Sequence, residues 1–264
     1  MSDPSTQSPS QPSTQPPSQP IGDQRRDRLY AGADAPASDF VFDERVARVF
    51  ADMLDRSVPG YQELIRLIGL VAARHISDGG LVFDLGCSLG AASASILARV
   101  PDPGLRIIAV DDSPAMLDEL RRRLPDAVAA GRLEPRCADL ADVEIQGASV
   151  VLLSLTLQFL PPSQRLEQLR RIRAGLADGG VLVLVEKVAW PDPVLSTLMN
   201  ELHADFKRAN GYSEMEISRK RAALERVLVP DGTDAHEARL DAAGFRRRER
   251  WFQCLSFVGW LAWP

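Results

Sequence analysis

The chain has 264 residues, a formal net charge of −5 and 45% hydrophobic residues, which suits one sizeable α/β domain with additions. The acidic balance is not that of a nucleic-acid-binding domain, and no apolar run approaches the ~20 residues of a membrane span. The N-terminus lacks the basic and apolar segments of a secretory signal. We therefore expect no direct nucleic-acid partner and no membrane association.

The cysteines and histidines bear on the compartment and on metal binding. Three widely separated cysteines, Cys87, Cys137 and Cys254, favour free thiols in a reducing cytoplasm over a disulfide framework. The three histidines are not paired at metal-ligand spacing, so we expect no metal site.

The first part of the chain differs in composition from the rest. Residues 1–20 are Pro, Ser, Gln or Thr apart from Met1 and Asp3. Such a segment cannot bury enough apolar area to offset the entropy lost on ordering. We expect a disordered tail over residues 1–37 and a single catalytic domain over residues 38–264.

Helical and strand patterns then follow in a regular order. Apolar residues from Phe40 recur at helical spacing, Pro59-Gly60 breaks the chain, and a second amphipathic helix leads into the first strand. The further segments, in chain order, are a strand at 81–84, a helix at 91–100, a strand at 105–110, a helix from Pro114, a weaker strand before Asp139, a strand at 150–155, a helix at 162–176 stopped by Gly179-Gly180, a strand at 181–185, a long helical region at about 194–229 and a hairpin-like edge at 245–261.

The strands are continuous apolar runs rather than alternating ones, which indicates a sheet covered on both faces. The predicted fold class is α/β: a doubly wound, mostly parallel Rossmann-like sheet, with an N-terminal helical region and a helical insert before the last strands. The basic run at 246–250 is most simply a solvated strand edge.

The segment Leu81–Ala92 predicts a ligand site. A strand ends in Asp84, a glycine-bracketed turn Gly86-Cys87-Ser88-Leu89-Gly90 follows, and a helix begins, the arrangement that lets backbone approach a nucleotide-type cofactor. The next strand ends in Asp111, which can accept hydrogen bonds from a ribose diol. Asp139, after the third strand, can accept one from an adenine amino group.

Acids at the ends of successive strands favour a cationic adenosine ligand over a pyrophosphate, because like charges repel. S-adenosylmethionine is therefore the preferred ligand. Helix capping is the alternative role for these acids, and Asp112 or Ser113 is expected to cap the helix that begins at Pro114. Cys87 has no histidine partner at a telling spacing, so we expect it to pack rather than to act as a nucleophile.

Arg221 is the unusual residue of the helical insert. Ser213 and Glu216 predict a capping box, and on the helical wheel Arg221 lies within an apolar stripe of Ile217, Leu224 and Leu228. A guanidinium there needs a partner. One interpretation is an internal salt bridge, for example with Glu186, or a side chain that reaches out to solvent; the other is a clamp for a substrate carboxylate.

Several blocks closely resemble the carboxy-S-adenosyl-L-methionine synthase family, within the class I methyltransferase-like superfamily. The resemblance extends over residues 40–258. The matching blocks are Phe42–Ala47, Arg56–Tyr61, Asp84–Gly90, Ser113–Met116, Thr156–Leu160, Phe206–Glu214 and Trp251–Cys254.

The resemblance implies a transferase that converts S-adenosyl-L-methionine and prephenate to carboxy-S-adenosyl-L-methionine and phenylpyruvate. A separate tRNA-modifying enzyme would then use the product at a wobble uridine, and the resemblance also suggests a homodimer. Matched position by position, it implies catalytic Arg221, which would hold the product carboxylate. The ligand-binding positions that it implies are Tyr61, Gly86, Cys87, Ser88, Asp111, Asp112, Asp139, Leu140, Ser154 and Arg221.

Ser154 stands where this family usually has Asn, and its hydroxyl cannot reproduce the hydrogen bonds of an amide. Two other functions are weighed against the synthase. One is an ordinary S-adenosylmethionine-dependent methyltransferase acting on a small molecule or tRNA. The other is a non-catalytic S-adenosylmethionine-binding protein, since fold does not decide function. No pattern selects the groups that would hold prephenate among Lys207, Arg208, Arg219 and Lys220.

Overall fold

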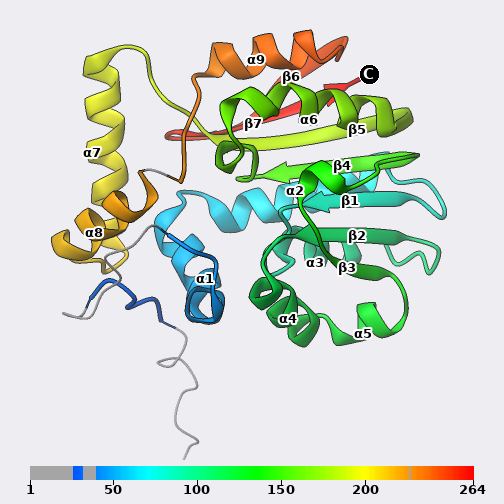
Figure 1. The fold of residues 1–264 in the computed structure, drawn as a ribbon, viewed down its shortest axis with the longest axis horizontal. Coiled ribbons are helices and arrows are strands. Elements are labelled where there is room, and N and C mark those ends of the chain that lie inside the picture. The colour runs from blue at the N-terminus through cyan, green and yellow to red at the C-terminus, as the bar shows by residue number, and fades with distance from the viewer. Residues whose placement is uncertain (1–25, 32–39, 226) are drawn as a thin grey trace, which may run out of the picture.

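A seven-stranded mixed sheet forms the centre of the computed structural model, which describes residues 26–31, 40–225 and 227–264 (Figure 1). The strand order is β3-β2-β1-β4-β5-β7-β6. The first five strands in this order are parallel, and β7 is antiparallel to both neighbours. The strands are β1 Leu81–Leu85, β2 Arg106–Asp111, β3 Leu133–Cys137, β4 Ala148–Ser154, β5 Leu176–Lys187, β6 Arg247–Cys254 and β7 Phe257–Trp263. The expected doubly wound, mostly parallel sheet is confirmed.

Helices cover both faces of the sheet, which explains the continuous apolar strands. Val82 packs with α2, α3 and α4 on one face, whereas its neighbour Phe83 packs with α6 and α9 on the other. The helices are α1 Glu44–Ser57, α2 Tyr61–His75, α3 Ala91–Leu97, α4 Pro114–Arg123, α5 Pro125–Ala129, α6 Pro162–Gly175, α7 Pro193–Ala209, α8 Glu214–Leu224 and α9 Thr233–Ala242. Both faces of each central strand are therefore removed from water.

The N-terminal boundary differs from the expected one. Residues 26–31 belong to the packed body: Tyr30 is buried with α1 and Ala223 of α8, and Asp27 is buried beside Lys220. The tail expected over 1–37 therefore extends too far, because the partners of these residues lie in helices much later in the chain. Residues 1–25 and 32–39 lie outside the described residues.

Two further element boundaries are corrected. Helix α6 ends at Gly175, before the expected Gly179-Gly180 stop, because Leu176 already pairs with Ala148 of β4. The long helical region expected to reach Val229 is two helices that end at Leu224. The backbone of Val229 instead bonds to the turn before α6 and to α6 itself: its N–H donates to the Gln158 carbonyl, and its carbonyl accepts from Arg165.

The insert helices α7 and α8 stand beside α1, away from the sheet, at the left of Figure 1. The C-terminal hairpin of β6 and β7 closes one edge of the sheet, as expected. Its basic run lies on edge strand β6, where Arg248 pairs with Asp241 and Arg250 with Glu237. Because strands β1 to β5 are parallel, their carboxyl ends lie at the same edge of the sheet.

Candidate active site at the carboxyl ends of the strands

The glycine loop after β1, from Gly86 to Gly90, packs closely against β2 and against the residues that follow β4. The backbone N–H groups of Gly86 and Cys87 both donate to the Val110 carbonyl, at 2.8 and 2.9 Å. Gly86 has φ +72°, and a Cβ at this position would lie 2.4 Å from Cγ2 and Oγ1 of Thr156. Only glycine fits both the backbone conformation and this close approach. These contacts place the loop at the carboxyl ends of β2 and β4.

Asp111 connects this loop to the next helix. Its Oδ2 accepts a hydrogen bond from the Ser88 N–H at 2.9 Å, and its Oδ1 accepts one from the Ser113 N–H at 3.0 Å. Burial raises the pKa of Asp111 above its usual range, although these two backbone bonds oppose the shift. Each carboxylate oxygen has a second lone pair, so Asp111 retains acceptors for a ribose diol.

The other acids divide into two groups. Asp112 and Asp139 are exposed at the same edge, and Asp139 also accepts from the Ala141 N–H at 2.7 Å. Ser113, not Asp112, caps α4. Asp84 differs, because it is buried and accepts a hydrogen bond from Ser93 of α3 at 2.6 Å. Burial raises the pKa of Asp84 to about 6. Because it is buried against α3, Asp84 supports the glycine loop and does not belong to the acidic rim formed by Asp111, Asp112 and Asp139.

The remaining expected binding positions lie around this edge. Leu140 follows Asp139 and is half-buried, and half-buried Ser154 ends β4. Tyr61 begins α2, and burial raises the pKa of its phenol. Cys87 is buried in the loop, and burial raises the pKa of its thiol well above its usual range. A thiol in this state is a poor nucleophile, which agrees with the packing role expected for it.

Arg221 does not lie where the helical wheel places it. The inward face of α8 comprises Glu216, Ile217, Lys220 and Ala223, and Arg221 is exposed. The salt bridge with Glu186, which was one of the two interpretations, is not formed: Glu186 is fully buried and accepts from the backbone N–H groups of residues 156–158. Arg221 makes no ion pair with any residue that the structure describes, so its guanidinium is open to a ligand.

A buried network decides this orientation of α8. Lys220 donates to Asp27 at 3.3 Å and to Ser57 at 3.1 Å. The Tyr212 hydroxyl donates to the same Asp27 carboxylate, and Arg56 lies 3.9 Å from the centre of the Tyr212 ring. These contacts direct Lys220 inward and leave the next residue, Arg221, on the outer side.

Sequence reasoning named Lys207 among four candidate cations, but it missed Lys187 and placed neither residue beside Arg221. Lys187 ends β5 and Lys207 lies near the end of α7, both half-buried. The Arg221 charge is one of the causes that lower the pKa of each, burial being the largest. One sequence signal could have found this group. Only three of the 31 lysine and arginine residues are lysine, and all three lie at positions 187 to 220.

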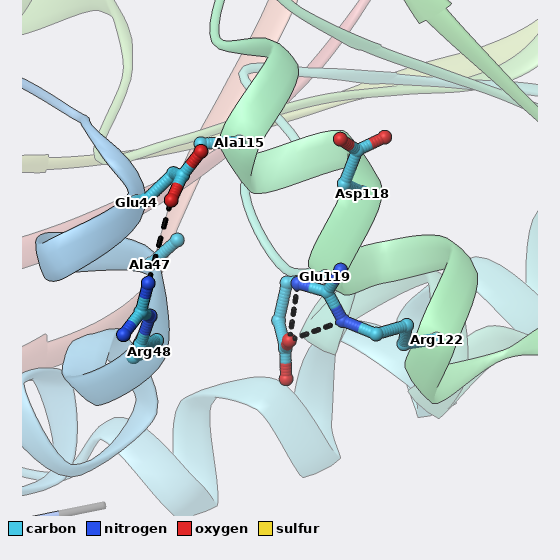
Figure 2. Close-up of a pocket in the computed structure, with 7 residues that line it drawn as sticks. All are labelled: Glu44, Ala47, Arg48, Ala115, Asp118, Glu119 and Arg122. Atoms are coloured by element: carbon cyan, nitrogen blue, oxygen red, sulfur yellow. Dashed lines mark hydrogen bonds and ion pairs between the residues drawn. The ribbon is translucent and has the colours of Figure 1, made fainter.

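A separate hollow lies between α1 and α4, with a volume of about 410 Å³. Figure 2 shows its charged lining, in which Arg48 pairs with Glu44 and Arg122 with Glu119. None of the expected site residues lines this hollow. Its charged side chains already form ion pairs, including Asp118 with Arg121 beside it, so the strand-end site remains the better candidate.

Sequence comparison finds relatives that match most of this chain. A family model described as a methyltransferase domain matches residues 83–182. A carboxy-S-adenosyl-L-methionine synthase of Geobacter metallireducens is 51% identical over 239 residues, which cover 90% of this chain and 98% of the relative. An Escherichia coli protein of the same name is 47% identical over 237 residues, which cover 90% and 96%.

Solved structures support the fold. A putative O-methyltransferase from Nostoc punctiforme aligns with a TM-score of 0.60 at 15% identity, covering 84% of this chain and 59% of that one. Human N-acetylserotonin methyltransferase, in complex with S-adenosylmethionine, aligns with a TM-score of 0.52 at 15% identity, covering 83% and 55%. Within the described residues, no helix is long and apolar enough to span a membrane, and no cluster of His, Cys, Asp or Glu could hold a metal ion.

Proposed function

This chain belongs to the carboxy-S-adenosyl-L-methionine synthase family, and from that premise we propose that it converts S-adenosylmethionine and prephenate to carboxy-S-adenosylmethionine and phenylpyruvate. S-adenosylmethionine is a substrate, and the enzyme is a transferase that places a carboxyl group on its methyl carbon. One observation carries the proposal. Arg221 is exposed and forms no ion pair with a described residue, and the same protein has an acidic rim suited to a nucleoside that carries a sulfonium charge.

The residues of the strand-end site fit S-adenosylmethionine. Asp111 has free lone pairs for the ribose hydroxyls, and exposed Asp139 is available to an adenine amino group. The rim of Asp111, Asp112 and Asp139 would favour the sulfonium charge. The loop from Gly86 to Ser88 would bring backbone against the amino-acid part of the ligand, as close backbone approach requires.

The chemistry requires orientation more than a protein base. The sulfonium acidifies the methyl group, and once the methyl carbon has lost a proton it can add to carbon dioxide, which forms the new carbon–carbon bond. Prephenate can lose carbon dioxide and hydroxide together because its ring becomes aromatic; the hydroxide would take the methyl proton and leave as water. Arg221 would hold the carboxylate that forms on the methyl carbon, through its planar pair of N–H donors.

Mass spectrometry of the products tests this proposal. Purified protein is mixed with S-adenosylmethionine and prephenate, and the expected product is S-adenosylmethionine with one added carboxyl group, together with phenylpyruvate. Labelling from the methyl group onto an acceptor without prephenate would instead identify an ordinary methyltransferase. Tight binding of S-adenosylmethionine without any turnover would identify a non-catalytic binding protein.

The role of Arg221 has its own test. Replacement by Leu removes the guanidinium from an exposed position, so folding should be unaffected. We expect carboxylated product to form at least ~10-fold more slowly and to be held more weakly, since a charge-assisted bond is lost. Product formation and binding equal to those of the parent would remove Arg221 from the site.

We also infer a cytoplasmic homodimer whose product passes to a separate enzyme that modifies the wobble uridine of tRNA. Support for a dimer comes from α7, where Val194, Leu198 and Leu202 are exposed at four-residue spacing and so share one face. The free cysteines are suited to a reducing compartment. Light scattering of the parent and of Leu198→Asp tests the dimer: a parent that is already monomeric contradicts it.

A further inference from the structure

The three lysines of this chain are placed together by the fold. Lys187 ends strand β5, whereas Lys207 and Lys220 lie on helices α7 and α8 of the insert. The charges of Lys187, Lys220 and Arg221 lie close enough to Lys207 to contribute to the lowering of its pKa. A chain that otherwise uses arginine for its positive charges therefore gathers its few compact, flexible ammonium groups in one place.

Packing around Phe257 brings the end of β5 against α7. Lys187 pairs with Phe257 across the β5–β7 ladder, and the Phe257 ring packs edge-on against the ring of His203, with 5.5 Å between centroids. His203 is fixed to α1 by its Nε2 contact with the Ser57 carbonyl, at 2.7 Å. Lys207 follows one helical turn after His203 on the same face of α7. Its side chain is thereby directed to the side on which β5 ends.

Among the described residues, Lys187 and Lys207 have no counter-charge of the kind that pairs with the buried cations of this chain. Buried Arg165 pairs with Asp231 at 2.5 Å, and buried Lys220 pairs with Asp27. Neither the Lys187 nor the Lys207 ammonium forms an ion pair or hydrogen bond within the described part of the chain. Like charges close together in a half-buried position are costly unless an anion joins them.

The electrostatic surroundings lead to the same conclusion. Burial and neighbouring positive charges lower the pKa of Lys207 to about 7, and burial with the Arg221 charge lowers that of Lys187. Burial and the same cations lower the pKa of His203 to about 3. The nearest acids on these elements are occupied elsewhere: Asp205 pairs with Arg208, and Glu186 accepts backbone N–H groups. The cluster therefore has a surplus of positive charge that an organic anion would neutralise.

We propose that Lys187 and Lys207 bind the carboxylate that the second substrate retains through the reaction, while Arg221 holds the carboxyl group that is transferred. The ligand class is a small organic acid with two carboxylates, of which the product acid keeps one. This inference rests on the proposed function. The acid that donates its carboxyl group would then lie between the end of β5 and α7, beside the end of β4 (Figure 1).

Binding without turnover tests this assignment. S-adenosylhomocysteine has no methyl group to carboxylate, so the protein loaded with it can be titrated calorimetrically with prephenate and with phenylpyruvate at pH 6.5. We expect Lys187→Met and Lys207→Met each to weaken binding of both acids by about tenfold or more. Binding of S-adenosylhomocysteine should remain within about twofold of the parent value.

Arg208→Met is the matched control, because Arg208 follows Lys207 in the same helix but pairs with Glu214 and Asp205 at the surface. It should bind both acids as the parent does. The variants Lys187→Gln and Lys207→Gln replace any Met variant that fails to fold, and Lys207→Arg should restore most of the affinity. Lysine variants that bind both acids as tightly as the parent overturn the proposal.

The same experiment separates this inference from the proposed function. A parent that binds both acids through the lysines but forms no carboxylated product supports the anion site and refutes the proposed reaction. A parent that forms the product, with lysine variants unchanged in acid binding and in KM for prephenate, refutes the anion site and supports the reaction.

Discussion

Replacement of Asp111 by Asn tests the ligand site most directly. The carboxylate accepts one backbone N–H on each oxygen, from Ser88 of the glycine loop and from Ser113 at the start of α4. Asn retains one acceptor and turns an amide NH₂ toward one of these donors. At least one charge-assisted bond is lost, and the charge that would attract a sulfonium disappears.

The magnitude follows from these lost contacts. A hydrogen bond to a charged group contributes roughly 1.5–3 kcal/mol, so the free energy of unfolding should fall by about that amount. Asn also loses one of the bonds available to the ribose diol. An equal loss in binding free energy means that S-adenosylmethionine binds about 10- to 150-fold more weakly.

The assay combines calorimetric titration of S-adenosylmethionine with urea unfolding of the unliganded protein. Asp102→Asn is a matched control, because Asp102 also accepts two backbone N–H groups, from Gly79 at 2.7 Å and Gly104 at 2.8 Å, but in a surface loop. It should bind S-adenosylmethionine as the parent does. If Asp111→Asn binds the ligand with parental affinity, Asp111 does not contact it and the assignment of the ribose site is refuted.

Three further outcomes are expected. Gly86→Ala should lower the free energy of unfolding by about 1–3 kcal/mol, measured with urea, because the new Cβ meets Thr156 at 2.4 Å; unchanged stability would contradict the close approach. Cys87 should resist iodoacetamide at pH 7.5 long after exposed Cys137 has reacted, as peptide mass mapping will show, since burial raises the pKa of the Cys87 thiol; equal reaction rates would contradict its burial. Burial raises the pKa of Glu186 to about 8 from an ordinary 4.5, so the native state binds more protons between these pH values and the contribution of Glu186 to stability is lost as pH rises through about 8. The stability advantage of the parent over Glu186→Gln should shrink between pH 5 and pH 9 in urea unfolding, and a constant or growing difference would refute this protonation.

Local features of the fold could be predicted from the sequence, and so could the loop and the acid that form the candidate nucleoside site. The sequence signals for the glycine loop, for the acid that ends β2 and for the cap of α4 each lie within a short stretch of chain, such as Ser113 and Pro114. Continuous apolar strands separated by helices also require the parallel, doubly covered sheet that the structure shows. The backbone conformation at such positions follows from nearest-neighbour chemistry.

The insert helices could not be placed in this way. A helical wheel relates residues of α8 to one another, but it does not state which side the rest of the protein covers. That side is decided by Asp27, which pairs with Lys220 across 193 positions of sequence, and the result is that Lys220 is buried and Arg221 exposed. An error of one residue on a short helix rotates the expected face by about 100°.

By itself, the sequence determined a doubly covered α/β sheet with acids at the carboxyl ends of its strands and a helical insert that carries Arg221. Only the tertiary structure decided that Arg221 is exposed and that Lys187 and Lys207 lie near it, with no ion-pair partner for either lysine among the described residues. The physical reason is that local hydrogen bonds and apolar periodicity are properties of neighbouring residues. A cluster of positive charge, in contrast, arises only when β5, α7 and α8 pack together, so residues far apart in the sequence form it.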